Sequence, residues 1–243
     1  MTAILRRACR PFVIFSPGAE ARCRDRNGQF RHVKPIVAAT APPYLARSML
    51  NDRLSALSLL QSRRSAKPRE LVGPGPTSEH LRVILEIAAR TPDHGKLFPW
   101  RFVLVGEDQR DAFGALLRQA LVEHDPCATI AHHQKEDEFA HYAGQLIVLV
   151  SAPVRDHKIP VWEQELSCGA AGMNLLLGAH ALGYVAGWVT GWRTYSERVR
   201  EAFCEPGQRI AGFIFIGHSA RELDDRDRSP AEPIVKRWQP IEV

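Results

Sequence analysis

The feature that most constrains this chain is the segment 162–183, which is small or apolar on almost every side. After Glu165 it contains no Asp, Glu, Lys or Arg, and glycine or alanine recurs along its length. An α-helix without a polar face has to be buried on all sides, and its small residues let another backbone approach closely. We therefore expect a helix that lies either at the centre of the fold or in the interface of a dimer.

Periodic patterns around this segment predict a mixed fold of helices and strands. Leu54, Leu57 and Leu60 predict an amphipathic helix that ends near Ser62, and the Pro- and Gly-rich residues 66–76 predict a loop. Further helices are predicted over 78–91, 108–124, 130–142 (polar and exposed) and 196–203, and strands over 101–106, 146–151 and 209–217. Residues 184–192 are predicted to pass from a strand into a loop. Together these elements predict a sheet of four or five strands.

The positive charge of the chain is concentrated at its N-terminus. Residues 1–50 carry eight Arg, one Lys, one Glu and one Asp, a net charge of +7, whereas the whole chain carries +5. The remaining residues therefore carry −2, and no nucleic-acid partner is expected for the body of the protein.

Residues 1–48 are interrupted by five prolines and sustain no period of 2 or 3.6. This pattern predicts a basic, disordered extension before a folded domain over 49–243. An organelle transit peptide, a nucleic-acid or membrane-tethering arm, and a start codon placed upstream of Met49 remain alternatives for the extension.

Several classes of protein are excluded by features that the sequence lacks. Its longest apolar runs have the length of strands, below the roughly 18 residues that span a bilayer, so no membrane association is expected. Five widely spaced cysteines without a C-x-x-C pair indicate a reducing compartment, which we take to be the cytoplasm. The fingerprints of Rossmann dehydrogenases, P-loop enzymes, zinc proteases and α/β-hydrolases do not occur. His132, His133 and His141 are interpreted as surface residues, and no metal site is predicted.

Three local clusters could bind a ligand. Residues 63–65, Arg-Arg-Ser, offer guanidinium groups and a hydroxyl to an anion such as phosphate, although arginines at a helix C-terminus also balance the helix dipole. Residues 90–94 lead into Phe-Pro-Trp at 98–100 and form a stiff loop with donors for a planar ligand, or else a simple helix stop. Residues 183–192 let backbone groups approach a ligand, or form a tight turn beside a packed helix.

Taken together and in order, these clusters resemble the signature of the nitroreductase family. The Arg-Arg-Ser triplet is followed by Arg90-x-Pro-Asp-His94 and by Pro99-Trp100. Trp162-Glu-Gln-Glu165, the small-residue helix and Gly-Trp-x-Thr-Gly at 187–191 continue the match, which covers residues 52–217. The Pro-Asp-His loop is most similar to the YdjA-type subgroup of small FMN-dependent nitroreductases.

The resemblance implies an α+β homodimer with a central, mostly antiparallel sheet flanked by helices, in which the long helix lies at the dimer interface and FMN is held there. It implies FMN contacts for Arg63, Arg64 and Ser65, for Arg90 and His94, and for Trp188, Val189 and Thr190. The stretch associated with the nicotinamide nucleotide is Gly178, Ala179, His180, Ala181, Leu182 and Gly183. A basic pair near the C-terminus of some relatives makes Lys236 and Arg237 candidates for a phosphate contact.

The implied activity is electron transfer from NADH or NADPH through FMN to nitroaromatics, quinones or similar acceptors, in a ping-pong reaction. Because the cofactor carries the chemistry, no catalytic side chain is expected. Phe98 stands where related sequences usually have Gln, and Val189 where they tend to have a basic residue, so an amide hydrogen bond and a charge near the cofactor are lost. The alternative is a protein that keeps the fold, has lost the flavin and acts as a binding module.

Overall fold

The computed structural model describes residues 22–24, 30–32, 49–228 and 233–240. The chain divides into two compact units, residues 1–47 and 48–243. In the first unit, the short strands β1 (Arg22–Arg24) and β2 (Phe30–His32) pair in antiparallel register, with Cys23 opposite Arg31. The sequence patterns did not predict this pair. The other residues of the predicted extension lie outside the described residues.

The second unit is built on a five-stranded sheet in which all paired strands are antiparallel. Its strands are β3 (Leu71–Val72), β4 (Trp100–Val105), β5 (Gln145–Ser151), β6 (Val185–Val189) and β7 (Arg209–Ser219). β7 pairs with β5 along one edge and with β6 and β3 along the other, and β4 pairs with β5. The predicted α+β class and the predicted number of strands are confirmed.

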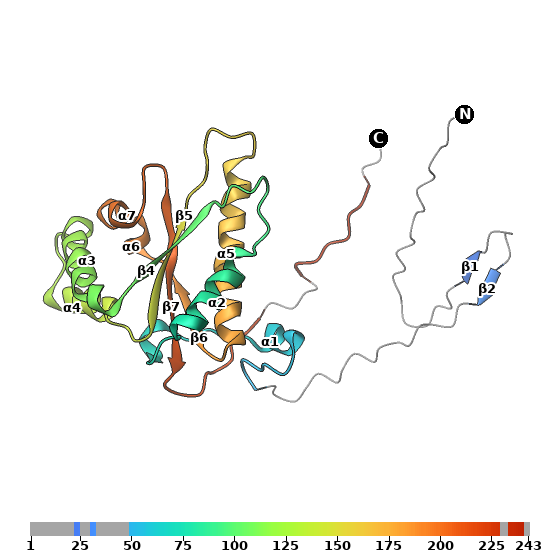
Figure 1. Cartoon of the computed structure of the whole chain (residues 1–243), viewed down its shortest axis with the longest axis horizontal. Coiled ribbons are helices and arrows are strands. Elements are labelled where there is room, and N and C mark those ends of the chain that lie inside the picture. The colour runs from blue at the N-terminus through green and yellow to red at the C-terminus, as the bar shows by residue number, and fades with distance from the viewer. Residues whose placement is uncertain (1–21, 25–29, 33–48, 229–232, 241–243) are drawn as a thin grey trace. The chain divides into compact units, whose positions relative to one another are not determined.

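Helices cover both faces of the sheet (Figure 1). One face, here called the α2–α5 side, carries α2 (Ser78–Ala89) and α5 (Val161–Ala181). The other, here called the α3–α4 side, carries α3 (Arg110–His124), α4 (Ile130–Ala140) and the short helices α6 (Trp192–Tyr195) and α7 (Glu197–Phe203). The remaining helices are α1 (Ala56–Ser62) and the 3-10 helices η1 (Pro68–Glu70) and η2 (Glu107–Gln109).

Each side of the sheet has its own hydrophobic core, because successive strand residues point to opposite faces. Alternate residues of β5 and β7 face the α3–α4 side: Leu146, Val148, Val150, Phe213 and Phe215. The residues between them face the α2–α5 side: Ile147, Leu149, Ile214 and Ile216. β5 is buried on both faces, which explains why its sequence is a continuous apolar run rather than an alternating one.

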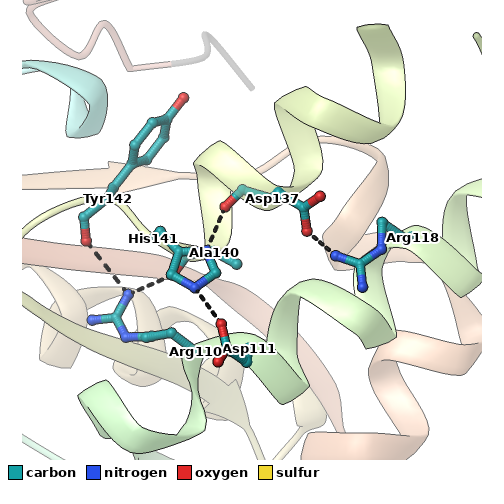
Figure 2. Close-up of polar contacts among 7 residues, drawn as sticks. All are labelled: Arg110, Asp111, Arg118, Asp137, Ala140, His141 and Tyr142. Carbon is teal, nitrogen blue, oxygen red and sulfur yellow. Dashed lines mark hydrogen bonds and ion pairs between the residues drawn. The ribbon is translucent and has the colours of Figure 1, made fainter. Parts of the chain in front are cut away.

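A buried arginine ties α3 to the end of α4 (Figure 2). Arg110 donates to the carbonyl oxygens of Ala140 and Gly144, each at 2.8 Å, and so satisfies acceptors left free beyond a helix C-terminus. Burial lowers the pKa of the Arg110 guanidinium. Close by, the His141 ring lies between the Asp137 carbonyl oxygen (2.8 Å) and the Asp111 carboxylate (2.9 Å). Within the described residues, no group of three or more His, Cys, Asp or Glu is placed to hold a metal ion.

The predicted first helix is confirmed and ends at Ser62 as expected, but its buried face differs from the prediction, and so does the predicted loop after it. α1 begins at Ala56, and its buried leucine is Leu59, whereas Leu54, Leu57 and Leu60 are 93%, 60% and 60% exposed. A spacing of three residues drifts around a helix of 3.6 residues per turn, so this pattern did not fix the buried face. The predicted loop 66–76 contains η1 and the short edge strand β3.

The prediction of a polar, exposed helix at 130–142 is also partly wrong. Glu136, Phe139 and Ala140 of α4 are buried. Arg193 of α6 accounts for the buried charge, because its guanidinium pairs with both carboxylate oxygens of Glu136 at 2.5 and 2.6 Å.

The long helix α5 is confirmed to within two residues at each end. Within one chain it is not enclosed on all sides, because an apolar stripe along it remains exposed: Trp162, Leu166, Ala170 and Met173. The opposite face packs against α2 and the sheet. The dimer-interface alternative for this helix therefore stays a prediction. No helix in the described part of the chain is long and apolar enough to cross a membrane.

Candidate functional site

The first predicted cluster, residues 63–65, follows α1 directly and is held by several hydrogen bonds. The side chain of Asn51 contacts the backbone of Arg64 twice, accepting from its N–H at 2.8 Å and donating to its carbonyl oxygen at 3.2 Å. Arg63 Nη1 donates to Ser65 Oγ at 2.9 Å, and Arg64 Nε donates to the carbonyl oxygen of Asp224 at 2.9 Å. All three residues of the cluster are half-buried, so their donors are fixed and still reachable.

Arg228, from the segment after β7, adds a third guanidinium group to this cluster. Its Nη2 donates to the Arg63 carbonyl oxygen at 3.4 Å. Burial, together with the positive charges of Arg228 and Arg64, lowers the pKa of Arg63. In the part of the chain that the structure describes, none of these three arginines forms an ion pair with a carboxylate. Such like charges without a counter-ion favour the binding of an anion.

His180 lies near Arg63, at the C-terminal end of α5. It is fully buried, and neither ring nitrogen meets the geometry of a hydrogen bond among the described residues, although the backbone of Tyr184 lies close enough to raise the pKa of the ring against the larger effects of burial and Arg63. Burial and the charge of Arg63 lower the pKa of His180 to about 4, so the ring is neutral at pH 7. A buried polar group without a partner is rare in folded proteins, and this one stands beside the cationic cluster.

The stretch predicted to contact the nicotinamide nucleotide forms the last turn and the end of α5. Gly178, Ala179 and His180 are buried, Leu182 and Gly183 are half-buried, and Ala181 is exposed. The nucleotide contact stays a prediction, and within one chain Ala181 is the most accessible member of the stretch.

The third predicted cluster, Trp188, Val189 and Thr190, ends β6. The Trp188 ring rests on Gly172 of α5, where an added Cβ would lie 2.6 Å from the ring, and its Nε1 donates to the Ala211 carbonyl oxygen at 3.1 Å. The indole therefore packs in the core of the α2–α5 side. Val189 is half-buried and Thr190 is exposed.

The first and third clusters lie together. A Cβ added to Gly187 would lie 2.6 Å from the carbonyl oxygen of Ala66, so the chain after Ser65 passes directly against β6. Glycine at this position permits the close approach.

The second predicted cluster, the loop 90–94, lies on α5. The Asn174 side chain donates to Thr91 Oγ1 at 2.7 Å, and Ser167 Oγ donates to the Pro92 carbonyl oxygen at 2.7 Å. His94 Nδ1 lies 2.9 Å from Glu163 Oε2. Arg90 and His94 are exposed. Sequence patterns did not identify these three α5 residues as partners of the loop, because they are 69 to 83 positions away from it and leave no local signal.

Within one chain, His94 and the 63–65 cluster lie at opposite ends of α5. His94 contacts Glu163, near the first residue of the helix, whereas Arg63 lies near His180, close to the last. Because an α-helix rises 1.5 Å per residue, Glu163 and His180 are about 25 Å apart along the axis.

The antiparallel sheet, the apolar central helix and these ordered clusters agree with a comparison against known families. The nitroreductase family model matches residues 60–218. This chain belongs to the nitroreductase family. It is 36% identical over 165 residues to the Escherichia coli (strain K12) protein named "Putative NAD(P)H nitroreductase YdjA", across 68% of this chain and 88% of that protein.

Solved structures of this family share the nitroreductase fold with this chain. The nitroreductase-like protein from Bacillus cereus has a TM-score of 0.65 at 20% identity, over 76% of this chain and 97% of that one. A Desulfovibrio desulfuricans structure, titled as a "putative nitroreductase in complex with fmn", has a TM-score of 0.56 at 23% identity, over 76% and 97% of the two chains.

Two of the remaining candidates in this nitroreductase lie in its C-terminal segment. Lys236 and Arg237 are exposed. The contacts that join this segment to the 63–65 cluster come instead from the carbonyl oxygen of Asp224 and from Arg228. Sequence reasoning missed these two residues because no local pattern distinguishes them from other charged residues of the tail.

Proposed function

We propose that this nitroreductase is an FMN-dependent NAD(P)H oxidoreductase that works as a homodimer and passes electrons to nitroaromatics, quinones or similar acceptors. The observation that carries this proposal is the cluster of Arg63, Arg64 and Arg228, which forms no ion pair with a carboxylate of the described residues and lies beside β6. The names of similar proteins support it, since one is named for NAD(P)H and a solved structure is titled as a complex with FMN.

The residues of this site fit the chemical groups of FMN. A phosphate needs positive charge and fixed donors, which guanidinium groups supply in a planar fork. Ser65, held by Arg63, adds a hydroxyl. A flavin ring needs a partly apolar surface with backbone groups at its edge, which Val189 and the exposed Thr190 offer at the end of β6.

FMN, when bound, supplies hydride acceptance and electron release. The side chains of this chain bind, orient and provide charge. Arg63 and Arg64 hold the phosphate or the polar edge of the ring, and their charge stabilises negative charge that develops there. His180 stays neutral beside them, so it adds no charge to the arginine cluster. No side chain is assigned a proton transfer.

The homodimer is proposed from two features of α5. Its exposed apolar stripe is typical of a surface that another chain covers. In addition, Glu163, which contacts His94, and His180, which lies near Arg63, are about 25 Å apart along α5, and this separates His94 from the 63–65 cluster of the same chain. If two copies of α5 packed antiparallel, the 90–94 loop of one chain would lie beside the 63–65 cluster of the other. We propose that two chains build each site in this way.

The visible absorption spectrum of the purified full-length protein tests the flavin. We expect two flavin bands, with or without added FMN, that bleach when NADPH or NADH is added without oxygen. The double variant Arg63→Met/Arg64→Met should lose the bands, whereas Arg82→Met, at an exposed arginine of α2, should keep them. A colourless wild-type protein that neither binds added FMN nor oxidises NADPH would contradict the proposal and favour a binding module.

A further inference from the structure

Phe98 has an aromatic side chain that the core does not use. Phe98 is 59% exposed, whereas Pro99 and Trp100, which follow it, are buried. Its backbone has a φ of +49°, in the left-handed region that bulky residues rarely adopt. Because the side chain is exposed, its packing contributes little free energy to offset the cost of the unfavourable backbone conformation.

The surroundings of Phe98 impose this conformation. Its N–H donates to Asp93 Oδ2 at 2.6 Å, and its carbonyl oxygen accepts from Arg101 Nη1 at 2.7 Å. The preceding residues are themselves fixed on α5 through Ser167 and Asn174. The ring is therefore presented from a well-anchored loop. Backbone strain that persists in this way is typical of residues with a function.

The position of Phe98 connects it with the candidate site. It lies between His94, whose ring contacts Glu163 at the start of α5, and the first residue of β4. Trp162, directly before Glu163, is 63% exposed as well. The loop that carries Arg90 and His94 thus presents a phenyl ring to its surroundings together with its polar groups.

We infer that Phe98 is a specificity-determining residue that stacks on the ring of an aromatic electron acceptor. This inference rests on the proposed function, because it requires an acceptor that binds beside the 90–94 loop. A phenyl ring has no hydrogen-bonding group, so it recognises a ligand through apolar contact and ring stacking. The chain therefore favours flat aromatic acceptors over compact ones without a ring.

The test compares a naphthoquinone, menadione, with ferricyanide, which has no ring to stack. One NADPH delivers two electrons, which together with protons convert one menadione to its hydroquinone, or which reduce two ferricyanide ions. The FMN-loaded variants are Phe98→Gln, Phe98→Leu and Phe98→Tyr. Ile130→Gln is the control, because Ile130 is 79% exposed and lies on α4, on the other side of the sheet.

We expect Phe98→Gln and Phe98→Leu to lower kcat/KM for menadione about tenfold, since stacking and apolar contact are lost. Phe98→Tyr keeps the ring and should match the wild type, and so should Ile130→Gln. The ratio of kcat/KM for menadione to kcat/KM for ferricyanide should therefore fall about tenfold in Phe98→Gln and Phe98→Leu, and it should stay within about twofold of the wild-type ratio in Phe98→Tyr and Ile130→Gln.

Three results would overturn the inference while leaving the proposed function intact. The first is an unchanged kcat/KM for menadione in Phe98→Gln, and the second is an equal loss of kcat/KM with menadione and ferricyanide. The third is a change in the oligomeric state of a Phe98 variant in sedimentation, which would mean that a second chain covers the ring. A colourless, NADPH-inert wild type is a different failure, because it would overturn the proposed function before any variant is compared.

Phe98→Gly separates a functional ring from a structural one. Glycine adopts positive φ readily, so this variant should keep or raise the Tm while it loses the preference for menadione. A Tm that falls by several degrees would show that the ring supports the fold and would overturn the inference.

Discussion

The two sides of the sheet bury similar cores but treat their polar groups differently. On the α3–α4 side, Arg193 pairs with Glu136 and lies 4.0 Å from the centre of the Phe139 ring. Arg110 of the same side donates to the carbonyl oxygen of Ala140, the last residue of α4 (Figure 2), and to that of Gly144. On the α2–α5 side, His180 has no hydrogen-bond partner among the described residues, and Arg63 stands among like charges.

This difference indicates which polar and apolar groups have a partner within one chain and which do not. On the α3–α4 side, Glu136 is paired with Arg193 within one chain, whereas the buried Arg110 contacts carbonyl oxygens and its Nε has no hydrogen-bond partner among the described residues. The α2–α5 side leaves a cationic cluster and an apolar stripe without partners in the described chain. An anionic cofactor and a second subunit would complete both, so substitutions on the two sides should affect different properties.

The largest effect is expected from Phe213→Ala in the core of the α3–α4 side. Phe213 is fully buried, and its ring centre lies 5.8 Å from that of Phe113 and 5.6 Å from that of Phe139. The cavity should lower the free energy of unfolding by about 4 kcal/mol, measured by urea denaturation. Leu57→Ala, at an exposed leucine of α1, should change it by less than about 0.5 kcal/mol. Similar losses in both variants would contradict the assignment of the core.

Glu136→Gln should have the next largest effect, because it leaves the Arg193 charge buried without its partner. We expect the free energy of unfolding to fall by about 3 kcal/mol. The matched variant Glu163→Gln breaks the exposed pair with His94 on the other side and should cost less than about 1 kcal/mol. If Glu163→Gln proved the more destabilising of the two, the comparison between the sides would be reversed.

The pH dependence of stability should report on His180. Its pKa is lowered from 6.5 to about 4 in the folded protein, so the unfolded chain binds more protons between these values and stability falls as the pH falls. Between pH 7 and pH 5 the loss from this residue should be about 2 kcal/mol. The difference in stability between the wild type and His180→Leu, measured at both pH values without flavin, isolates this contribution. An identical pH slope in both proteins would show that His180 is not buried as a neutral ring.

The smallest effect on stability is expected from Arg63→Met, together with a large effect on binding. Removing one of three neighbouring positive charges should leave the flavin-free protein within about 0.5 kcal/mol of the wild type, or slightly more stable. The Kd for FMN, measured by flavin fluorescence, should rise about 10- to 100-fold, because a hydrogen bond to a charged group is lost. A destabilised protein with unchanged FMN affinity would assign Arg63 to the fold instead.

Short sequence patterns predicted the helices and strands whose formation depends mainly on neighbouring residues in the chain. The apolar run of β5 and the part of α5 after Glu165, which has no charged residue, each follow from the sequence, and both are present where the patterns placed them. The three candidate clusters were likewise visible as short motifs. Patterns failed at α1, where Leu54, Leu57 and Leu60 are exposed, because a period of three does not say which side a partner covers.

The geometry between clusters could not be predicted, because it depends on residues far apart in the chain. The sequence does not show, for example, that the indole of Trp188 packs inward against Gly172. It likewise does not reveal that Ser167 and Asn174 anchor the 90–94 loop along α5, which places His94 and the 63–65 cluster at opposite ends of that helix. This placement adds to the exposed apolar stripe of α5 as an argument for a second chain.

The most direct test of a site shared by two chains is complementation between two defective subunits. One subunit carries Arg63→Met/Arg64→Met, the other carries Arg90→Met/His94→Gln, and the hybrid dimer is purified through different tags. If each site takes the 63–65 cluster from one chain and the 90–94 loop from the other, each variant homodimer loses FMN. The hybrid then recovers one intact site, with about half the flavin of the wild-type dimer. A hybrid without flavin, beside a wild type that binds it fully, would contradict a shared site.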